Sequence, residues 1–355
     1  MKTENTTTLK SFRTLGRSGL IVSPLALGTM TFGTPRWGSP DGVSKVIFDA
    51  YVDAGGNFVD TADVYSGGRS EELLGGYIAE RKLRNKLVLA TKFTFNAESG
   101  NPNAGGNGRK NIYRALENSL RRLQTDYVDL YWLHAWDAVT PVEEVLQTFG
   151  DLIRAGKIRY FGLSDVPAWY AAQMWAFAAA HNAPAPIALQ LEYSLVERSI
   201  EREHLPAARA CGLGVLPWSP LAAGFLAGKY KRKEAGASGE GRLSGSNPFG
   251  DTKFTDRNWR ILDVLRQVAA EIERPPAQVA LAWVSAQSGI TAPIIGVSKP
   301  EQLRDNLASM EITFTAKQLQ KINEASKLEA SFSDGIPKSI INSYIFGGVN
   351  VEGWR

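Results

Sequence analysis

Short apolar runs, each bounded by polar or turn-forming residues, recur at nearly regular intervals along the 355-residue chain. Runs of this kind are typical of strands that are buried on both faces of a parallel sheet. The sequence predicts eight such strands, at 25–28, 57–60, 87–91, 127–133, 158–163, 187–191, 213–217 and 293–296. Seven of the eight begin roughly 26 to 40 residues apart, which is about the length of one strand–helix unit.

Helical periodicity fills the intervals between these strands. Helices are predicted at 41–54, 70–80, 109–123, 142–155, 167–181, 200–211, 257–272 and 300–309, with additional helical patterns at 276–288 and 316–327. This alternation predicts an α/β fold in one domain over residues 1–355, a (β/α)8 TIM barrel. An open doubly wound sheet is disfavoured, because no G-x-G-x-x-G motif follows the first strand.

Three segments lie outside the repeated units. Residues 12–22 are predicted to form a hairpin that turns at 16–19 and caps the amino-terminal end of the barrel. The Gly/Ser/Lys-rich segment 229–253 follows the seventh strand, so we expect a long loop on the rim that carries the chemistry. The tail, 331–355, is expected to fold back over the barrel mouth, with disorder as the alternative.

Composition excludes several classes of protein. The net charge of +4 comes from 40 basic and 36 acidic residues that are interspersed, which argues against nucleic-acid binding but is compatible with an anionic small-molecule cofactor. The single cysteine, Cys211, excludes an intrachain disulfide framework and indicates a reducing compartment. The sequence shows neither a signal core nor a membrane span, so a cytoplasmic location without a membrane partner is expected. Nothing in the composition indicates an oligomer.

Four polar residues that are far apart in the sequence, Asp60, Tyr65, Lys92 and His134, fall at or just after the ends of predicted strands. They are expected to meet, because the carboxyl ends of barrel strands share one rim. A phenol, with a pKa near ~10, is a poor proton donor at neutral pH unless its anion is stabilised. A neighbouring lysine ammonium stabilises that anion, and a carboxylate keeps the lysine protonated. With a histidine to orient a carbonyl oxygen, the group suits protonation of an alkoxide as hydride reaches a carbonyl carbon.

Each of these residues alone has an ordinary structural interpretation. An aspartate after a strand usually caps a helix or shapes a loop, as Asp63 could, and a rim lysine is usually solvated. A lone histidine is more often a satisfied polar residue than a catalyst. The joint placement at the ends of the second, third and fourth strands favours a catalytic group. The other histidines, His181 and His204, lie away from strand ends, so no metal cluster is evident.

The order and spacing of eight stretches resemble the aldo-keto reductase superfamily, and in particular its bacterial aryl-alcohol-dehydrogenase-like and sugar-converting members. The stretches are LALGTMTFG (25–33), FVDTADVYSGGRSEELLG (58–75), LATKF (89–93), DYVDLYWLHAWD (126–137), GKIRYFGLSD (156–165), LQLEYSL (189–195), LPWSPLAAGFLAGKY (216–230) and IIGVSKPEQLRDN (294–306). The resemblance covers nearly the whole chain. It implies that Tyr65 is the general acid, that Lys92 and Asp60 tune it, and that His134 orients the substrate.

The resemblance also implies a nicotinamide cofactor at the remaining strand ends. Ser164, Asp165 and Gln190 are implied to bind its carboxamide, and Trp218 is implied to stack on its ring. The family usually has asparagine at position 165; an aspartate carboxylate cannot donate a hydrogen bond, so an altered grip is expected there. The other implied cofactor contacts are Gly28, Thr29, Met30, Asp60, Ser219, Pro220, Leu221, Gly224, Leu226, Lys229, Gly296, Ser298, Lys299, Gln302 and Asn306.

NADP(H) is favoured over NAD(H) by the segment after the eighth strand. Ser298 and Lys299 open a predicted helix, where backbone N–H groups, a hydroxyl and an ammonium suit a 2′-phosphate. No acidic residue precedes Glu301 in this segment to bind a ribose 2′-hydroxyl. The alternative is a capped surface helix with no ligand.

The substrate pocket is harder to predict. Trp37, Phe93 and Trp136, with Trp132 as a further candidate, could line it beside Tyr65 and His134, or could be ordinary packing. The leading hypothesis is an NADPH-dependent oxidoreductase that acts on small aromatic or sugar-like aldehydes, ketones or alcohols. One alternative is a cofactor-sensing regulatory subunit resembling potassium-channel β-subunits. Another is a barrel aldolase in which Lys92 forms a Schiff base.

Overall fold

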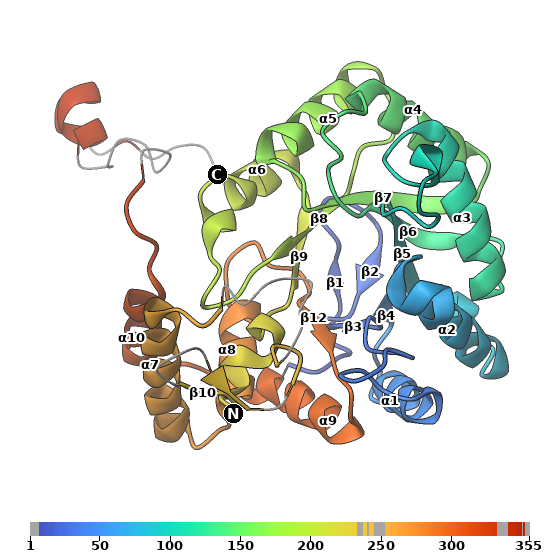
Figure 1. Ribbon diagram of the computed structural model, residues 1–355. Coiled ribbons are helices and arrows are strands. Elements are labelled where there is room, and N and C mark those ends of the chain that lie inside the picture. The colour runs from blue at the N-terminus through green and yellow to red at the C-terminus, as the bar shows by residue number, and fades with distance from the viewer. Residues whose placement is uncertain are drawn as a thin grey trace, which may run out of the picture.

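The computed structural model of the protein describes residues 7–232, 237–239, 241–244, 253–331, 340–349 and 351. Its central feature is a sheet of eight parallel strands in the order β12-β3-β4-β5-β6-β7-β8-β9 (Figure 1). The strands are β3 (Ala26–Gly28), β4 (Phe58–Asp60), β5 (Val88–Phe93), β6 (Val128–Leu133), β7 (Ile158–Ser164), β8 (Ala188–Glu192), β9 (Gly214–Trp218) and β12 (Ile294–Gly296).

The two edges of this sheet meet and close a barrel. Val215 in β9 forms a parallel bridge with Ile290, just before β12, and the Thr291 N–H donates to the Val215 carbonyl at 2.8 Å. Each strand runs in the same direction, so the carboxyl ends of all eight lie at one rim. The predicted TIM barrel is confirmed.

Helices surround the barrel in the predicted places (Figure 1). They are α1 (Asp41–Asp53), α2 (Arg69–Glu80), α3 (Arg109–Leu123), α4 (Val142–Arg154), α5 (Ala168–Ala180), α6 (His204–Cys211), α7 (Asp256–Ile272), α8 (Pro276–Ser285), α9 (Pro300–Ala308) and α10 (Ala316–Ser326). The helix predicted at 200–211 begins later, at His204, after a short 3₁₀ turn. Pro206 explains this start, because proline is tolerated in the first turn of a helix but not in its interior.

Apolar side chains fill two layers. One lies inside the barrel and includes Phe58, Ala90 and Trp132, and the other lies between the strands and the helices. The interior has little room to spare. Gly162 lies opposite Trp132 on the neighbouring strand, and a Cβ at that position would come within 2.3 Å of the indole ring. A buried tryptophan beneath the rim is therefore possible only because its neighbour is glycine.

The predicted amino-terminal hairpin is confirmed as β1 (Arg13–Thr14) paired antiparallel with β2 (Ile21–Val22). Its turn packs against the starts of β8 and β9, where the Arg17 N–H donates to the Gly212 carbonyl at 2.7 Å. Gly16 has a φ of +61°, and a Cβ there would lie 2.4 Å from the Ile187 carbonyl oxygen. The hairpin thus closes the end of the barrel opposite to the strand carboxyl ends, as Figure 1 shows.

Two predicted segments are less regular than the barrel. The loop after β9 begins with the 3₁₀ turns η5 (Ala222–Ala227) and then a short hairpin, β10 (Lys231–Arg232) with β11 (Ala237–Ser238); much of the remainder of 229–253 lies outside the described residues. The tail prediction fails for the described residues. The turn Ile341–Ile345 lies beside the barrel rather than over its mouth, and Tyr344 is 85% exposed (Figure 1). The apolar side chains of this turn, among them Ile345 and Phe346, remain exposed rather than packed on the rim. Residues 332–339, 350 and 352–355 lie outside the described part.

Candidate active site

A buried ion pair lies at the centre of the barrel mouth. Asp60 ends β4, and Lys92 lies in the adjacent strand β5 with its ammonium paired to the Asp60 carboxylate. The side chains are 3% and 0% exposed, respectively. The Lys92 Nζ also donates to the Thr61 carbonyl at 2.8 Å and to the Tyr65 hydroxyl at 3.2 Å. The ammonium therefore has three oxygen partners and no contact with solvent.

This pairing fixes the charge of Lys92. Burial lowers the pKa of the ammonium, but attraction to Asp60 and to Tyr65 outweighs burial and raises it overall. Removal of one partner from a buried ion pair leaves an uncompensated charge. The lysine is consequently held protonated, with one of its hydrogens directed at the phenol.

Tyr65 lies on η1 (Tyr65–Gly68), the turn that connects β4 to α2. Positive φ angles at Ser66 and Gly67 bend the chain just after it, and the centroid of the Tyr65 ring lies 4.9 Å from the Lys92 Nζ. Burial raises the pKa of Tyr65, and the Lys92 charge offsets only part of that rise. The sequence indicates only the stabilising ammonium; burial is the larger effect, and the phenol stays protonated at neutral pH.

His134 follows β6 and faces the same space. Its backbone N–H donates to the Phe93 carbonyl at 3.1 Å, and its ring meets Tyr65 edge to face with centroids 5.9 Å apart. Burial and the nearby Lys92 charge lower the pKa of the imidazole well below its usual value, so the ring is neutral. Its buried Nδ1 has no hydrogen-bond partner among the described residues. A neutral imidazole with an unused nitrogen can orient a carbonyl oxygen by hydrogen bonding.

The predicted carboxamide trio lies at the ends of β7 and β8. The Ser164 hydroxyl is buried and has no partner among the described residues, whereas the Gln190 amide donates to Asp60 Oδ1 at 3.1 Å. Asp165 has a φ of +46°, and its Oδ1 accepts a 2.9 Å hydrogen bond from the Trp218 indole N–H. Asp165 is exposed, but neighbouring protein atoms partly desolvate its carboxyl and raise its pKa to about 6, with the Trp218 hydrogen bond acting against the rise. This hydrogen bond holds Trp218 against Asp165, the residue that stands where the family usually has asparagine.

The end of β3 contributes Gly28, Thr29 and Met30. Gly28 pairs with Asp60 and with Gly296, so it lies between the catalytic strand and β12. The Thr29 hydroxyl is buried and bonds within the fold, to the Asp60 carbonyl and to a serine of α2. The Thr29 backbone is engaged as well, because its N–H donates to the Asp60 carbonyl at 2.9 Å and its carbonyl accepts from the Ser70 hydroxyl at 2.8 Å. Met30 is half-buried.

The segment after β9 forms a tight turn. Ser219 Oγ accepts from the Ala223 N–H at 2.9 Å, Gly224 has a φ of +88°, and Leu226 is fully buried. Pro220 is buried as well, and Leu221 is half-buried. These residues shape a backbone surface, and the functional side chain at its end is the exposed Lys229. Burial and the neighbouring Lys299 charge lower the pKa of the Lys229 ammonium.

Lys299 itself occupies the N-cap of α9, ahead of Pro300. The Ser298 N–H and hydroxyl donate to the Gln302 side-chain oxygen at 2.9 and 3.3 Å. Gln302 therefore occupies the donors that a phosphate would use, and a bound phosphate would have to displace it. Gly296 is exposed and Asn306 is buried on the same helix. Two ammonium groups, from Lys229 and Lys299, thus approach one helix start.

A family comparison accounts for this arrangement of side chains. The family model described as aldo/keto reductase family matches residues 24–327, which span the whole barrel. The chain belongs to the aldo/keto reductase family.

Curated relatives agree with the family assignment. The chain is 34% identical over 337 residues to an aryl-alcohol dehydrogenase of Pestalotiopsis microspora, covering 92% of this chain and 83% of the relative. It is 33% identical over 324 residues to norsolorinic acid reductase of Aspergillus flavus, covering 89% and 80%. A probable voltage-gated potassium channel subunit beta of Oryza sativa subsp. japonica is 35% identical over 306 residues, covering 85% and 91%.

Family membership supports the general chemistry. The chain is an oxidoreductase. Its family uses a nicotinamide cofactor and acts on small carbonyl or alcohol compounds. Among the described residues, no group of three or more His, Cys, Asp or Glu side chains could hold a metal ion. In the same part of the chain, no helix is long and apolar enough to cross a membrane.

The predicted aromatic pocket needs correction in this aldo/keto reductase. Phe93 is fully buried between the barrel and α4, with Tyr131 5.0 Å away, so it does not line a pocket at the mouth. Adjacent residues of a strand point to opposite faces, so Phe93 could not share the interior with Lys92. Trp132 fills the barrel interior below the rim.

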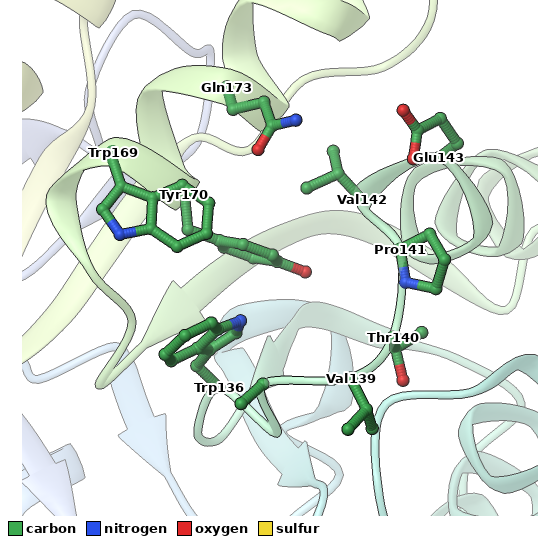
Figure 2. A pocket seen from close by; sticks show the side chains of 10 residues that line it. Trp136, Val139, Thr140, Pro141, Val142, Glu143, Trp169, Tyr170 and Gln173 are labelled. Atoms are coloured by element: carbon green, nitrogen blue, oxygen red, sulfur yellow. The ribbon is translucent and has the colours of Figure 1, made fainter.

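Phe95, which is absent from the predicted pocket residues, takes the place expected of Phe93. Its ring is 46% exposed and meets His134 edge to face at 4.7 Å. Trp37 is half-buried, with the Arg242 guanidinium 4.9 Å from its ring. Trp136 lies on the outer side of the rim, against Trp169 (Figure 2). Strand alternation excludes Phe93 from the barrel mouth, but it does not point to Phe95, which lies in the loop beyond β5.

Proposed function

We propose that the protein is an NADPH-dependent carbonyl reductase, with Tyr65 as the proton donor. In the reverse direction the same enzyme would act as an alcohol dehydrogenase. The observation that carries this proposal is the Tyr65 hydroxyl, which lies 3.2 Å from a buried, charge-paired Lys92 and beside a neutral His134. These three groups surround one point at the barrel mouth. A carbonyl oxygen there would meet a proton donor and a neutral hydrogen-bonding imidazole.

Each residue of the catalytic group has a distinct part. Tyr65 donates its proton to the carbonyl oxygen as the alkoxide charge develops. General-acid catalysis of this kind accelerates the reaction by roughly 10²–10⁴-fold. Lys92 stabilises the phenolate left behind, and Asp60 keeps Lys92 protonated. The buried, unpartnered nitrogen of His134 supports a role in orienting the substrate. In alcohol oxidation the same proton returns to Tyr65.

The remaining rim fits a nicotinamide dinucleotide. The buried hydroxyl of Ser164 lacks a partner among the described residues, which a carboxamide could provide. Trp218 offers a ring face, and the turn 219–226 offers backbone groups. A bound nicotinamide would supply the hydride. The approach of Lys229 to Lys299 supports a 2′-phosphate at α9, hence NADP(H) rather than NAD(H).

Aromatic carbonyl compounds are the proposed substrate class. The exposed ring of Phe95 against His134 offers a flat apolar surface beside the proposed reacting point. Relatives whose names state aryl-alcohol dehydrogenase or norsolorinic acid reductase favour the same class. Sugar-like substrates would gain less from such a surface.

The test is NADPH oxidation by the purified protein with aryl aldehydes, ketosugars, dicarbonyls and quinones, each also offered with NADH. We expect the highest kcat/KM for an aryl aldehyde with NADPH, and a loss of roughly 10²–10⁴-fold in kcat for Tyr65→Phe. The matched control is Tyr113→Phe on α3, which also removes a single phenol oxygen. Full activity in Tyr65→Phe would exclude Tyr65 as the donor, and absence of any turnover in the wild type would exclude the reductase.

A regulatory subunit is the second candidate, favoured by the 35% identity to the potassium channel subunit beta of rice. Slow cofactor exchange without useful turnover would support it. The barrel-aldolase alternative is opposed by the ion pair: a Schiff base requires a neutral amine, whereas Asp60 and Tyr65 raise the pKa of Lys92 and keep it charged. Borohydride trapping of a substrate adduct on Lys92 would reverse that conclusion.

A further inference from the structure

A cavity lies on the outer side of the rim, apart from the catalytic group. Its volume is about 210 Å³, and it is formed by the connection from β6 to α4 and by the first turns of α5 (Figure 2). The lining residues from the connection are 136 and 138–143, and those from α5 are Trp169, Tyr170 and Gln173. None of them has a part in the proposed chemistry.

Tyr170 provides an unused polar group in this cavity. Its side chain is 2% exposed, and its hydroxyl has no hydrogen-bond partner among the described residues. Figure 2 shows that hydroxyl directed into the space between Trp136 and Val142. A buried polar group without a partner costs about 1–3 kcal/mol. A molecule in the cavity that offers a hydrogen-bonding atom would recover that loss.

The walls suit a flat aromatic ring. Trp136 and Trp169 meet at 90° with centroids 5.5 Å apart, and Tyr170 lies 5.8 Å from Trp169. Trp136 remains 36% exposed and Trp169 56% exposed, although tryptophan is a residue that proteins usually cover. Pro141 and Val142 complete an apolar wall opposite the rings (Figure 2). An additional aromatic ring packs favourably against rings held at such angles, either edge to face or in an offset stack.

The connection that forms one wall is held rigidly. The Asp137 carboxylate accepts from the N–H groups of Val139 and Thr140 and from the Thr140 hydroxyl, the last at 2.6 Å. It also accepts from the Asn107 N–H at 2.8 Å, which ties the connection to the loop before α3. A wall fixed before binding lowers the entropic cost of binding.

Charge narrows the class of ligand. Among the lining residues the ionisable groups are Glu143 and the phenol of Tyr170, and Asp137 lies beside them; none is a lysine or arginine. Burial raises the pKa of Tyr170, with Asp137 and Glu143 adding to the rise, so the phenol is neutral. Two nearby carboxylates disfavour an anionic ligand.

We propose that this cavity binds an uncharged aromatic ring whose oxygen substituent forms a hydrogen bond with the Tyr170 hydroxyl. The ring could belong to a separate aryl molecule or to the far end of an extended aryl carbonyl substrate. Only the extended substrate rests on the proposed function. The cavity is within reach of such a substrate, because Trp136 lies two residues after His134, which separates their Cα atoms by at most about 7 Å.

The experiment uses 4-fluorophenol as the probe, followed by ¹⁹F NMR, on the full-length protein and on Tyr170→Phe and Trp169→Ala. Tyr170→Phe keeps the ring and removes only the hydroxyl, and Tyr113→Phe is the matched control. We expect an up to tenfold weaker Kd for Tyr170→Phe, the effect of one hydrogen bond of about 1 kcal/mol, and a larger loss for Trp169→Ala. Unchanged binding in both variants, or no binding to the wild type, would overturn the proposal.

Kinetics then identify the source of the ring. Benzaldehyde and 4′-hydroxybiphenyl-4-carbaldehyde differ in a second ring that carries a hydroxyl. If the cavity takes the far ring of the substrate, Tyr170→Phe raises KM for the long aldehyde and not for benzaldehyde, and 4-fluorophenol competes with the long aldehyde alone. If it takes a separate molecule, 4-fluorophenol binds without competing with either. A wild type that reduces neither aldehyde would refute the proposed function, while the NMR titration would still decide the cavity.

Discussion

The two halves of the barrel mouth differ in how complete they are without a ligand. In the half formed by β4, β5 and β6, the buried Asp60 and Lys92 pair with each other, and Lys92 also bonds the half-buried Tyr65 hydroxyl. In the half formed by β7, β9 and β12, Ser164 has a hydroxyl without a partner among the described residues, and Lys299 is exposed. Apart from the unpartnered His134 Nδ1 and Asp63 Oδ1, the first half is assembled by folding, whereas the second keeps groups available for a ligand.

Burial explains the difference. A lysine ammonium with no solvent contact must be paired, because an isolated buried charge is costly. Lys299 at the start of α9 remains hydrated and needs no partner in the fold. The comparison suggests that changes in the first half disturb both stability and catalysis, and that changes in the second half disturb ligand affinity alone.

The largest effect is expected from Lys92→Met. This substitution leaves Asp60 as an uncompensated buried carboxylate, so the free energy of unfolding should fall by about 3–5 kcal/mol. It also removes the cation beside Tyr65, and kcat should fall by at least about 10²-fold. Chemical denaturation and steady-state kinetics on an aryl aldehyde measure the two losses.

A double variant separates these two losses. Asp60→Asn with Lys92→Met removes both buried charges and should regain much of the stability without regaining the rate. A Lys92→Met variant that unfolds like the wild type would show that the pair contributes nothing to the fold. If its kcat also stayed normal, the distinction between the two halves of the mouth would fail.

The first half is the easier to predict from the sequence. Barrel topology forces strand ends to one rim, so the pattern of strands alone brings Asp60, Lys92 and His134 together. Strand alternation can exclude Phe93 once Lys92 is placed inside, but it does not indicate Phe95, whose position depends on the loop after β5. The direction of the Tyr65 pKa shift is not predictable from the sequence, because it depends on how deeply the phenol is buried.

The second half depends on contacts that a linear pattern does not specify. The Gln302 side chain occupies the Ser298 donors through contacts four residues apart at the start of α9. The influence of the Lys299 charge on Lys229 depends on where the loop after β9 lies. The unpartnered hydroxyl of Tyr170 likewise arises from packing of α5 against the connection after β6. The described part of the tail carries apolar residues that stay exposed, so its apolar pattern alone does not direct it to the rim, and the position predicted for it is wrong.

A smaller effect is expected at the proposed phosphate site, from the double variant Ser298→Ala, Lys299→Ala. One charge-assisted contact contributes about 1.5–3 kcal/mol, so NADPH affinity should fall by about tenfold to a hundredfold while NADH affinity stays almost unchanged. Quenching of tryptophan fluorescence, with Trp218 as reporter, gives both affinities. The melting temperature should not change, unlike that of Lys92→Met. Equal losses for the two cofactors would make the segment structural.

Asp165 should make cofactor affinity depend on pH. Its pKa is raised to about 6, so the carboxyl loses its proton as pH rises through that value. The protonated form can donate to a carboxamide oxygen and the carboxylate cannot. NADPH binding to the wild type should therefore weaken between pH 5 and pH 8, by up to about tenfold for one neutral hydrogen bond.

Asp165→Asn serves as the internal reference for that effect. A phosphate monoester also titrates near pH ~6, but it does so equally in the wild type and in the variant. The ratio of their Kd values therefore isolates Asp165, and it should change with pH. A constant ratio from pH 5 to pH 8 would mean that Asp165 does not contact the cofactor.

The smallest effect is expected at Asp63, within the first half. Its Oδ1 is buried without a hydrogen-bond partner among the described residues, and burial, with the Glu71 charge, raises its pKa to about 7. A carboxyl whose pKa is raised on folding stabilises the fold below its ordinary pKa. That contribution is lost as pH rises from about 4 to about 7.

Asp63→Asn should remove the loss and, after allowance for partial exposure, stabilise the protein at pH 8 relative to pH 5 by about 1 kcal/mol. Calorimetric melting at the two pH values, with the exposed Asp305→Asn as control, measures it. An identical pH dependence in Asp63→Asn and the wild type would show that this carboxyl is solvated, and that the first half is less completely closed to water than its ion pair suggests.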